Sequence, residues 1–360
     1  MNTDASASHP PQILALLERL YSEEYRAHQC RPQPAPELAD WRHAARPALR
    51  RLIGLDAIEA SHEEHLPPVR LFDEVEEFDG YARRPGRIET EPNVQIEFWM
   101  LRPTGAGPFP LAVLPHGHEE RGHDTYAGVA HSPEHRERRI VGARADVAVQ
   151  AAQRGFVAIA PNTRGFGPSG IADLNARHDN RGCRSELMHC ILADRTPIGE
   201  RVWDLSRVLD WACGLPEVDA SRVLMMGNSG GGVATVYASA CDTRVSMAVP
   251  SCSYCTFVGK SGLIHHCDCN CVPGIMRFGE MHDVAALIAP RPILIVNGRE
   301  DPLFPTSEVD RAVERLRAIY RAAGAERHFG FAWGPEGHRF YPDVMWPVVE
   351  HVLNTGDLTA

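Results

Sequence analysis

Residues 223–235 read Val-Leu-Met-Met-Gly-Asn-Ser-Gly-Gly-Gly-Val-Ala-Thr, and this stretch decides the fold class. A short run of large apolar residues ends at Gly227, a serine follows at position 229, and small residues continue in a helical pattern. A Gly-x-Ser-x-Gly motif between a buried strand and a helix is typical of a nucleophile on a tight corner. Glycines suit the flanking positions because side chains there would collide with the adjacent strand and helix. We therefore predict that Ser229 is a nucleophile near a helix N-terminus, where developing negative charge is stabilised. The alternative interpretation is an ordinary glycine-rich turn.

Similar apolar runs recur along the chain and alternate with helical patterns. The runs lie at 111–114, 157–160, 246–249 and 293–296, and the helical patterns at 145–152, 200–213, 232–240 and 307–323. Strands that alternate with helices predict a parallel sheet with helices on both faces. Residues 94–100 alternate at period two, which indicates antiparallel β-structure before the first parallel strand. Ligands of such sheets bind beyond the carboxyl ends of the strands, so we expect the partners of Ser229 in those loops.

A serine nucleophile needs a base, and the base needs a third group that orients it. Asp301 lies in the loop after the last of these apolar runs, where the acid of such a site is expected, and Glu300 beside it is the main rival. A solvated or helix-capping role is the alternative for Asp301. His338 follows a glycine in a loop after a final alternating segment, whereas His328 at the start of that segment is the weaker candidate. We predict a catalytic triad of Ser229, Asp301 and His338.

The oxyanion of an acyl-transfer reaction needs two backbone N–H groups directed at one oxygen. One should come from Gly230, the residue after the nucleophile. The other should come from the loop after residues 111–114, where the amide of His118 is the first choice and that of Gly117 the second. Glycine in this loop allows the backbone to approach a substrate closely. The predicted site contains no metal ligand and requires no cofactor.

These motifs resemble the α/β-hydrolase superfamily. Residues 162–169 look like the Arg-Gly-x-Gly-x-Ser loop that follows the fourth strand of that fold. Residues 199–204, 216–219 and 287–292 are similar to segments of bacterial acetyl-xylan-esterase-like and dienelactone-hydrolase-like serine esterases. The resemblance covers about residues 70 to 350. It implies an α/β fold with an eight-stranded, mostly parallel sheet.

The resemblance implies ester hydrolysis by Ser229, Asp301 and His338, with Gly230 and His118 as oxyanion donors. Dienelactone hydrolases proper have cysteine where this chain has Ser229, which favours ester hydrolysis over lactone chemistry. A short-acyl ester, such as an acetylated carbohydrate, is the substrate that the resemblance suggests. A serine peptidase or acyltransferase would use the same triad. A non-catalytic binding protein or a zinc hydrolase are more distant alternatives.

Cysteines and histidines concentrate after the run 246–249, in a segment that we expect to wall the substrate pocket. They comprise Cys252, Cys255, His265, His266, Cys267, Cys269 and Cys271. Packed thiols, one or two disulfides, and a metal site all remain open for this segment. Alternate cysteines on a strand would crowd one face instead of surrounding an ion, which weighs against the metal.

Composition and charge limit the remaining classes. The chain has 360 residues and a formal net charge of −10, without a Lys/Arg cluster that would follow a nucleic-acid backbone or an anionic membrane. No secretory signal or membrane span is visible, which favours a cytoplasmic enzyme acting on a small-molecule ester. We expect a helical N-terminal extension over residues 1–65 and a catalytic domain over 66–360. Inserts near 166–200 and 252–283 are the expected pocket walls; the oligomeric state stays open.

Overall fold

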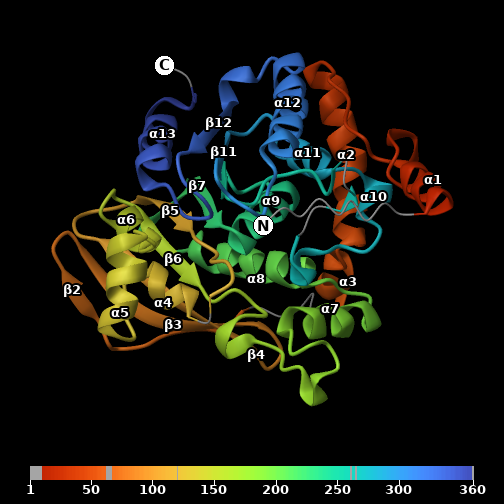
Figure 1. The fold of residues 1–360 in the computed structure, drawn as a ribbon. Helices are drawn as coiled ribbons and strands as arrows, with labels where there is room; N and C mark the ends of the chain where they lie inside the picture. The colour runs from red at the N-terminus through yellow and green to blue at the C-terminus, as the bar shows by residue number, and fades with distance from the viewer. Residues whose placement is uncertain (1–9, 62–66, 120, 260–261, 264–265, 359–360) are drawn as a thin grey trace.

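A sheet of ten strands forms the centre of the computed structural model, which describes residues 10–61, 67–119, 121–259, 262–263 and 266–358 (Figure 1). The strands follow the order β1-β3-β4-β6-β5-β7-β8-β11-β12, and β2 pairs with β3 beside this path. Their bounds are β1 Val69–Leu71, β2 Glu76–Phe78, β3 Tyr81–Glu91, β4 Val94–Pro103, β5 Phe109–Val113, β6 Val157–Pro161, β7 Val218–Asn228, β8 Met247–Ser251, β11 Ile293–Gly298 and β12 Phe329–Gly334. A separate two-stranded hairpin pairs β9 (Val258–Gly259) with β10 (Gly262–Leu263).

The sheet is mostly parallel, as the sequence predicts. Every pairing from β6 through β5, β7, β8 and β11 to β12 is parallel, whereas β4 pairs antiparallel with β3 and β6. The eight strands from β3 to β12 in spatial order form the expected eight-stranded sheet, and the short β1 and β2 extend it at the β3 edge. All five predicted apolar runs form strands of this sheet.

Helices cover both faces because the side chains of the central strands alternate between two buried clusters. Leu111 and Val113 of β5 face one cluster, and Ala112 faces the other. The first cluster packs against α2, α8, α9, α11 and α12, and the second against α4, α6 and α13. In Figure 1 the two groups lie on opposite sides of the sheet, with α6 and α13 to the left.

The helices match the predicted patterns, with several short additions. Their bounds are α1 Pro11–Leu20, α2 Ala35–Leu52, α3 Leu55–Ser61, α4 Gly122–Tyr126, α5 Pro133–His135, α6 Val147–Ala152, α7 Gly182–Leu192, α8 Pro197–Ala212, α9 Gly230–Cys241, α10 Ile275–Phe278, α11 Met281–Ala286, α12 Thr306–Ala322 and α13 Pro342–Thr355. A π-helical segment occupies Arg136–Gly142. Among the described helices, none combines the length and the apolar character that crossing a bilayer requires.

The N-terminal helix α2 is joined to the catalytic layers by buried side chains and hydrogen bonds. Leu38 and Leu49 of α2 belong to the first core cluster. The Arg46 guanidinium donates to the carbonyl of Ala240 in the last turn of α9 and to that of Leu287 at the end of α11, each at 2.8 Å. Cations at helix C-termini satisfy free carbonyls and stabilise the helix dipole. The assignment of residues 1–65 as a separate extension stays a prediction, and residues 1–9 and 62–65 lie outside the described ones.

Candidate active site

Ser229 lies on a strained corner between β7 and α9. Its φ and ψ of 58° and −125° fall in a region that residues with a side chain rarely adopt, at a cost of about 1–3 kcal/mol. The Ser229 amide donates to the carbonyl of Ser251 at the end of β8, at 2.8 Å, and this bond helps hold the corner in place. The helix that begins at Gly230 directs its N-terminus at the same point. Negative charge that develops beside the serine is therefore favoured.

The two glycines of the motif are explained by the loop after β5. A Cβ at position 227 would lie 2.5 Å from the carbonyl oxygen of Pro115, and one at position 231 would lie 2.0 Å from the same atom. Both distances are far below contact distance, so side chains at these positions would push the loop away. The glycines let the β5 loop rest directly on the nucleophile corner.

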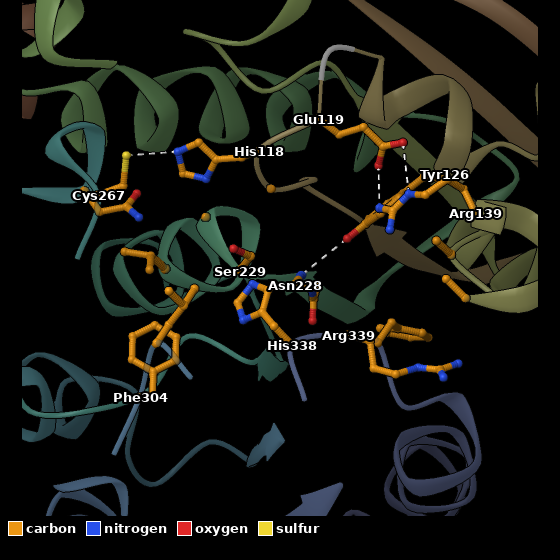
Figure 2. Close-up of a pocket in the computed structure, with 18 of the residues that line it drawn as sticks. His118, Glu119, Tyr126, Arg139, Asn228, Ser229, Cys267, Phe304, His338 and Arg339 are labelled. Atoms are coloured by element: carbon orange, nitrogen blue, oxygen red, sulfur yellow. Dashed lines mark hydrogen bonds and ion pairs between the residues drawn. The ribbon is translucent and has the colours of Figure 1, made fainter. Parts of the chain in front are cut away.

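The predicted acid and base meet at the carboxyl ends of the two last strands. His338, in the loop after β12, shares a 2.6 Å hydrogen bond between its Nδ1 and Oδ2 of Asp301, in the loop after β11. The Asp301 side chain is fully buried, and its other oxygen accepts the Leu303 amide at 2.9 Å. A buried carboxylate bound to Nδ1 leaves Nε2 free to accept a proton. Figure 2 shows the His338 ring and Ser229 projecting into the same part of the cavity.

The two rival residues lie elsewhere. Glu300 is exposed to solvent. His328 donates from Nδ1 to the Pro290 carbonyl at 2.6 Å and pairs with Asp357, at the amino end of β12. The geometry therefore supports Asp301 and His338 as the partners of Ser229, as the sequence predicts, while their catalytic roles remain proposals.

The β5 loop approaches the serine closely enough to supply an oxyanion donor. A Cβ at Gly117 would lie 2.9 Å from the Ser229 Cβ and 3.2 Å from the Gly230 amide nitrogen. His116 fixes the loop from behind, because its Nε2 accepts the Thr163 amide at 3.0 Å and its Nδ1 bonds the Gly117 carbonyl at 2.8 Å. Burial lowers the pKa of His116 to about 4, so the ring is neutral and can make both bonds. The amides of Gly230, His118 and Gly117 remain the predicted donors.

A cavity of about 930 Å³ opens over this corner (Figure 2). Its lining comprises Gly117, His118, Glu119, Tyr126, Arg138, Arg139, Gly142, Ala143, Ala145, Asn228, Ser229, Gly230, Val233, His266, Cys267, Asn270, Leu303, Phe304, His338, Arg339 and Phe340. Segment 252–283 contributes to the wall, as expected. Segment 166–200 contributes no lining residue, and the stretch 138–145 does so instead. The expectation for 166–200 was wrong because that segment packs behind Cys267, whereas the π-helical stretch carries no periodic signal in the sequence.

Charged side chains lie at the cavity wall and behind it, and the sequence analysis did not predict their pairing. Glu119 is paired with Arg139 at 2.7 Å. Burial opposes the ionisation of Glu119, but Arg139, together with hydrogen bonds from Thr125 and His135, outweighs burial and lowers its pKa to about 2. Behind the wall, the buried Arg164 of the Arg-Gly loop donates to Asp204 of α8 at 2.8 Å and also pairs with Glu91. These pairs tie the loop after β6 to α8 and to the end of β3.

The cysteines of the 252–283 segment do not form one group. All ten cysteines of the chain lie within the described residues, and each is a free thiol. Cys252 lies near Asp301 and His338, with its sulfur donating to the Arg339 carbonyl at 3.2 Å. Cys267 and Cys269 instead contact His118, at 3.1 and 3.3 Å from its Nε2. His265 lies outside the described residues.

Solved structures with the same fold include carbohydrate esterases. A Bacteroides fragilis protein with a provisional assignment as an acetyl xylan esterase aligns with a TM-score of 0.74 at 15% identity, over 98% of this chain and 97% of its own. A glucuronoyl esterase from Teredinibacter turnerae aligns with a TM-score of 0.61 at 17% identity, over 89% and 85% of the two chains. Identities this low show the shared fold alone.

The sheet order and the strained serine corner at the end of β7 define an enzyme of the α/β-hydrolase class. The family model described as "Dienelactone hydrolase family" matches residues 138–332, more than half of the chain. The chain therefore belongs to the dienelactone hydrolase family. A Bacillus subtilis protein provisionally named hydrolase YtaP is 28% identical over 165 residues, which span 44% of this chain and 55% of that relative.

Proposed function

We propose that the protein is a serine carboxylic-ester hydrolase that acts through Ser229, His338 and Asp301 and an acyl-enzyme intermediate. One observation carries the proposal: a 2.6 Å bond from the buried Asp301 carboxylate to Nδ1 orients His338, which lines the same cavity as the strained Ser229. A base oriented by a buried acid beside a serine on a rigid corner is the arrangement that activates a hydroxyl.

The reaction proceeds in two displacements. His338 Nε2 takes the proton of Ser229 Oγ while Oγ forms a bond to the ester carbonyl carbon. The amides of Gly230 and of His118 or Gly117 stabilise the negative carbonyl oxygen of the tetrahedral intermediate. His338 then gives the proton to the departing alkoxide, and the C–O bond of the ester breaks. His338 takes a proton from water as the water oxygen attacks the acyl carbonyl carbon. The bond to Ser229 Oγ then breaks, His338 returns the proton to Oγ, and the acid leaves.

We propose short-acyl esters, such as acetylated carbohydrates, as the substrates. Two solved neighbours are described as acetyl xylan esterases, and this likeness is what supports the acetyl group. The cavity also suits a sugar, since polar side chains such as Arg138, Asn270 and Arg339 line it together with Phe304 and Phe340. Sugars present hydroxyls to polar groups and apolar ring faces to aromatic residues.

Ser229→Ala tests the nucleophile. We expect kcat on 4-nitrophenyl acetate to fall on the order of 10⁶-fold, because the other triad members contribute little without the serine. A fluorophosphonate probe should label the wild type and Ser253→Ala, a buried serine after β8, but not Ser229→Ala. Circular dichroism should show both variants folded. Near-normal turnover by folded Ser229→Ala would end the proposal.

A substrate panel tests the specificity. Initial rates would be compared on acetyl, butyryl and octanoyl 4-nitrophenyl esters, acetylated xylo-oligosaccharides, a methyl ester of glucuronate and acyl-peptides. The proposal expects the highest kcat/KM on acetyl esters of sugars. Preference for acyl-peptides would instead favour a serine peptidase, and acyl transfer to an added alcohol faster than to water would favour an acyltransferase.

A further inference from the structure

Four potential metal ligands from three distant segments converge beside the active-site cavity. They are His118, Cys183, Cys267 and Cys269, whose ligand atoms all lie within 4.8 Å of one another. His118 Nε2 is 3.1 Å from the Cys267 sulfur and 3.3 Å from that of Cys269. Figure 2 shows the His118 ring turned away from Ser229 and towards Cys267.

The fold, and not proximity in the sequence, assembles this group. His118 stands in the loop after β5 and Cys183 in the first turn of α7, whereas Cys267 directly precedes the turn Asp268–Asn270 and Cys269 lies within it. That turn is a 3₁₀-helix and not a strand. The expected objection that alternate cysteines crowd one face of a strand therefore does not apply, and both sulfurs reach the same point.

The surroundings favour thiolates. The buried Arg201 of α8 donates to the Cys269 carbonyl and to Asn270 Oδ1, both at 3.2 Å. Thiolates are the form of cysteine that binds metals, and a nearby guanidinium offsets their charge.

We propose that His118, Cys183, Cys267 and Cys269 bind one Zn²⁺ ion in a closed tetrahedral site. Three thiolate sulfurs and one imidazole nitrogen form one of the usual ligand sets of structural zinc. Three thiolates and Zn²⁺ carry a net charge of −1, next to the buried Arg201 guanidinium, which also pairs with Glu186 at 3.3 Å. A disulfide, by contrast, would use only two of the three converging sulfurs.

The proposed ion has a structural role, because four protein ligands leave no position for water or substrate. It would fasten the β5 loop to α7 and to segment 266–271, which walls the cavity. His118 follows Gly117, whose backbone rests on the nucleophile corner. The zinc would thus act as a positioning device for the oxyanion loop; this link to catalysis rests on the proposed function, whereas the metal site does not.

Metal analysis of the full-length protein, purified without a metal-affinity step, tests the proposal. We expect about one zinc per chain in the wild type, in Ser229→Ala and in Cys271→Ser. Cys271 is the matched control, because it lies in the same segment but outside the group. Cys183→Ser and Cys269→Ser should lose most of the zinc. Cobalt exchanged into the wild type should give thiolate-to-metal absorption and the bands of tetrahedral cobalt, a readout that does not depend on folding of the variants.

Esterase activity provides the second part of the test. Cys183→Ser, at a half-buried ligand position on α7, should lose about 10- to 100-fold in kcat/KM, as expected for a catalytic loop displaced by about 1 Å. Wild-type protein that is folded, free of metal and titrates all ten thiols would overturn the site, and so would a disulfide between any two of these cysteines. Zinc-loaded protein without esterase activity would overturn the proposed function while leaving the site standing.

Discussion

The substitution Asp301→Asn tests the role of the orienting carboxylate while the rest of the site stays in place. One oxygen of Asp301 accepts the Leu303 amide at 2.9 Å, and the other faces His338 Nδ1 at 2.6 Å. In the variant the Leu303 amide keeps the side-chain oxygen on its side, so the new NH₂ group must face Nδ1. Nδ1 then accepts instead of donating, the ring proton moves to Nε2, and Nε2 loses its capacity to take the proton of Ser229.

We expect kcat to fall about 10⁴-fold, equivalent to about 5.4 kcal/mol, with KM little changed. The substitution is nearly isosteric, so the melting temperature should change little. The assay is kcat and KM on 4-nitrophenyl acetate, together with the rate of fluorophosphonate labelling, which should slow in parallel. Glu300→Gln, at the adjacent exposed position, is the matched control and should retain wild-type rates. Comparable losses in the two variants, or a larger loss in Glu300→Gln, would refute the assignment of Asp301.

Two further predictions concern the framework. Gly231→Ala places a Cβ 2.0 Å from the Pro115 carbonyl oxygen and should lower the free energy of unfolding by about 1–3 kcal/mol and reduce kcat. The control Gly230→Ala, whose Cβ would have no neighbour closer than 3.6 Å, should unfold at a urea midpoint near that of the wild type. Equal urea midpoints for the two variants would contradict this packing. Burial opposes the ionisation of Glu91, but the ion pairs with Arg195 and Arg164 outweigh burial and lower the pKa of Glu91 to about 2. The ionised Glu91 therefore contributes its full stabilisation above about pH 4.5, and this stabilisation is lost as the pH falls towards 2. Glu91→Gln should therefore cost on the order of 3 kcal/mol at pH 7, and a difference from wild type in urea unfolding that does not shrink on acidification would argue against the ion pairs.

The residues proposed for catalysis were predictable because each carries a local signal. Ser229 has two glycines at fixed offsets between a strand and a helix, and Asp301 and His338 follow the last two strands of an alternating pattern. The carboxyl ends of parallel strands lie at one edge of the sheet. Asp301 and His338, which follow Ser229 by 72 and 109 residues in the sequence, therefore return to the edge where the serine lies.

The proposed zinc ligands and the cavity wall had no comparable signal in the sequence. Cys183 is 84 residues from Cys267, and their meeting depends on how α7 packs beneath an irregular segment. The wall at 138–145 is π-helical in part, a conformation without a periodic sequence pattern. Arg164 was recognisable only through a family likeness, since its pairing with Asp204 requires the packing of the β6 loop on α8.

The contact of Arg46 with the end of α9 links helix α2 to the helix that begins beside the proposed nucleophile. The helix has 12 residues and is about 18 Å long, with the Arg46 cation at its negative pole and the proposed oxyanion site at its positive pole. One axis of aligned peptide dipoles thus connects position 46 to the reacting carbonyl. A shortened enzyme that lacks α2 would leave the Ala240 and Leu287 carbonyls without this donor and weaken the support under a serine that is already strained. For protein engineering, we expect that α2 must be kept together with the catalytic layers and cannot be exchanged as an independent module.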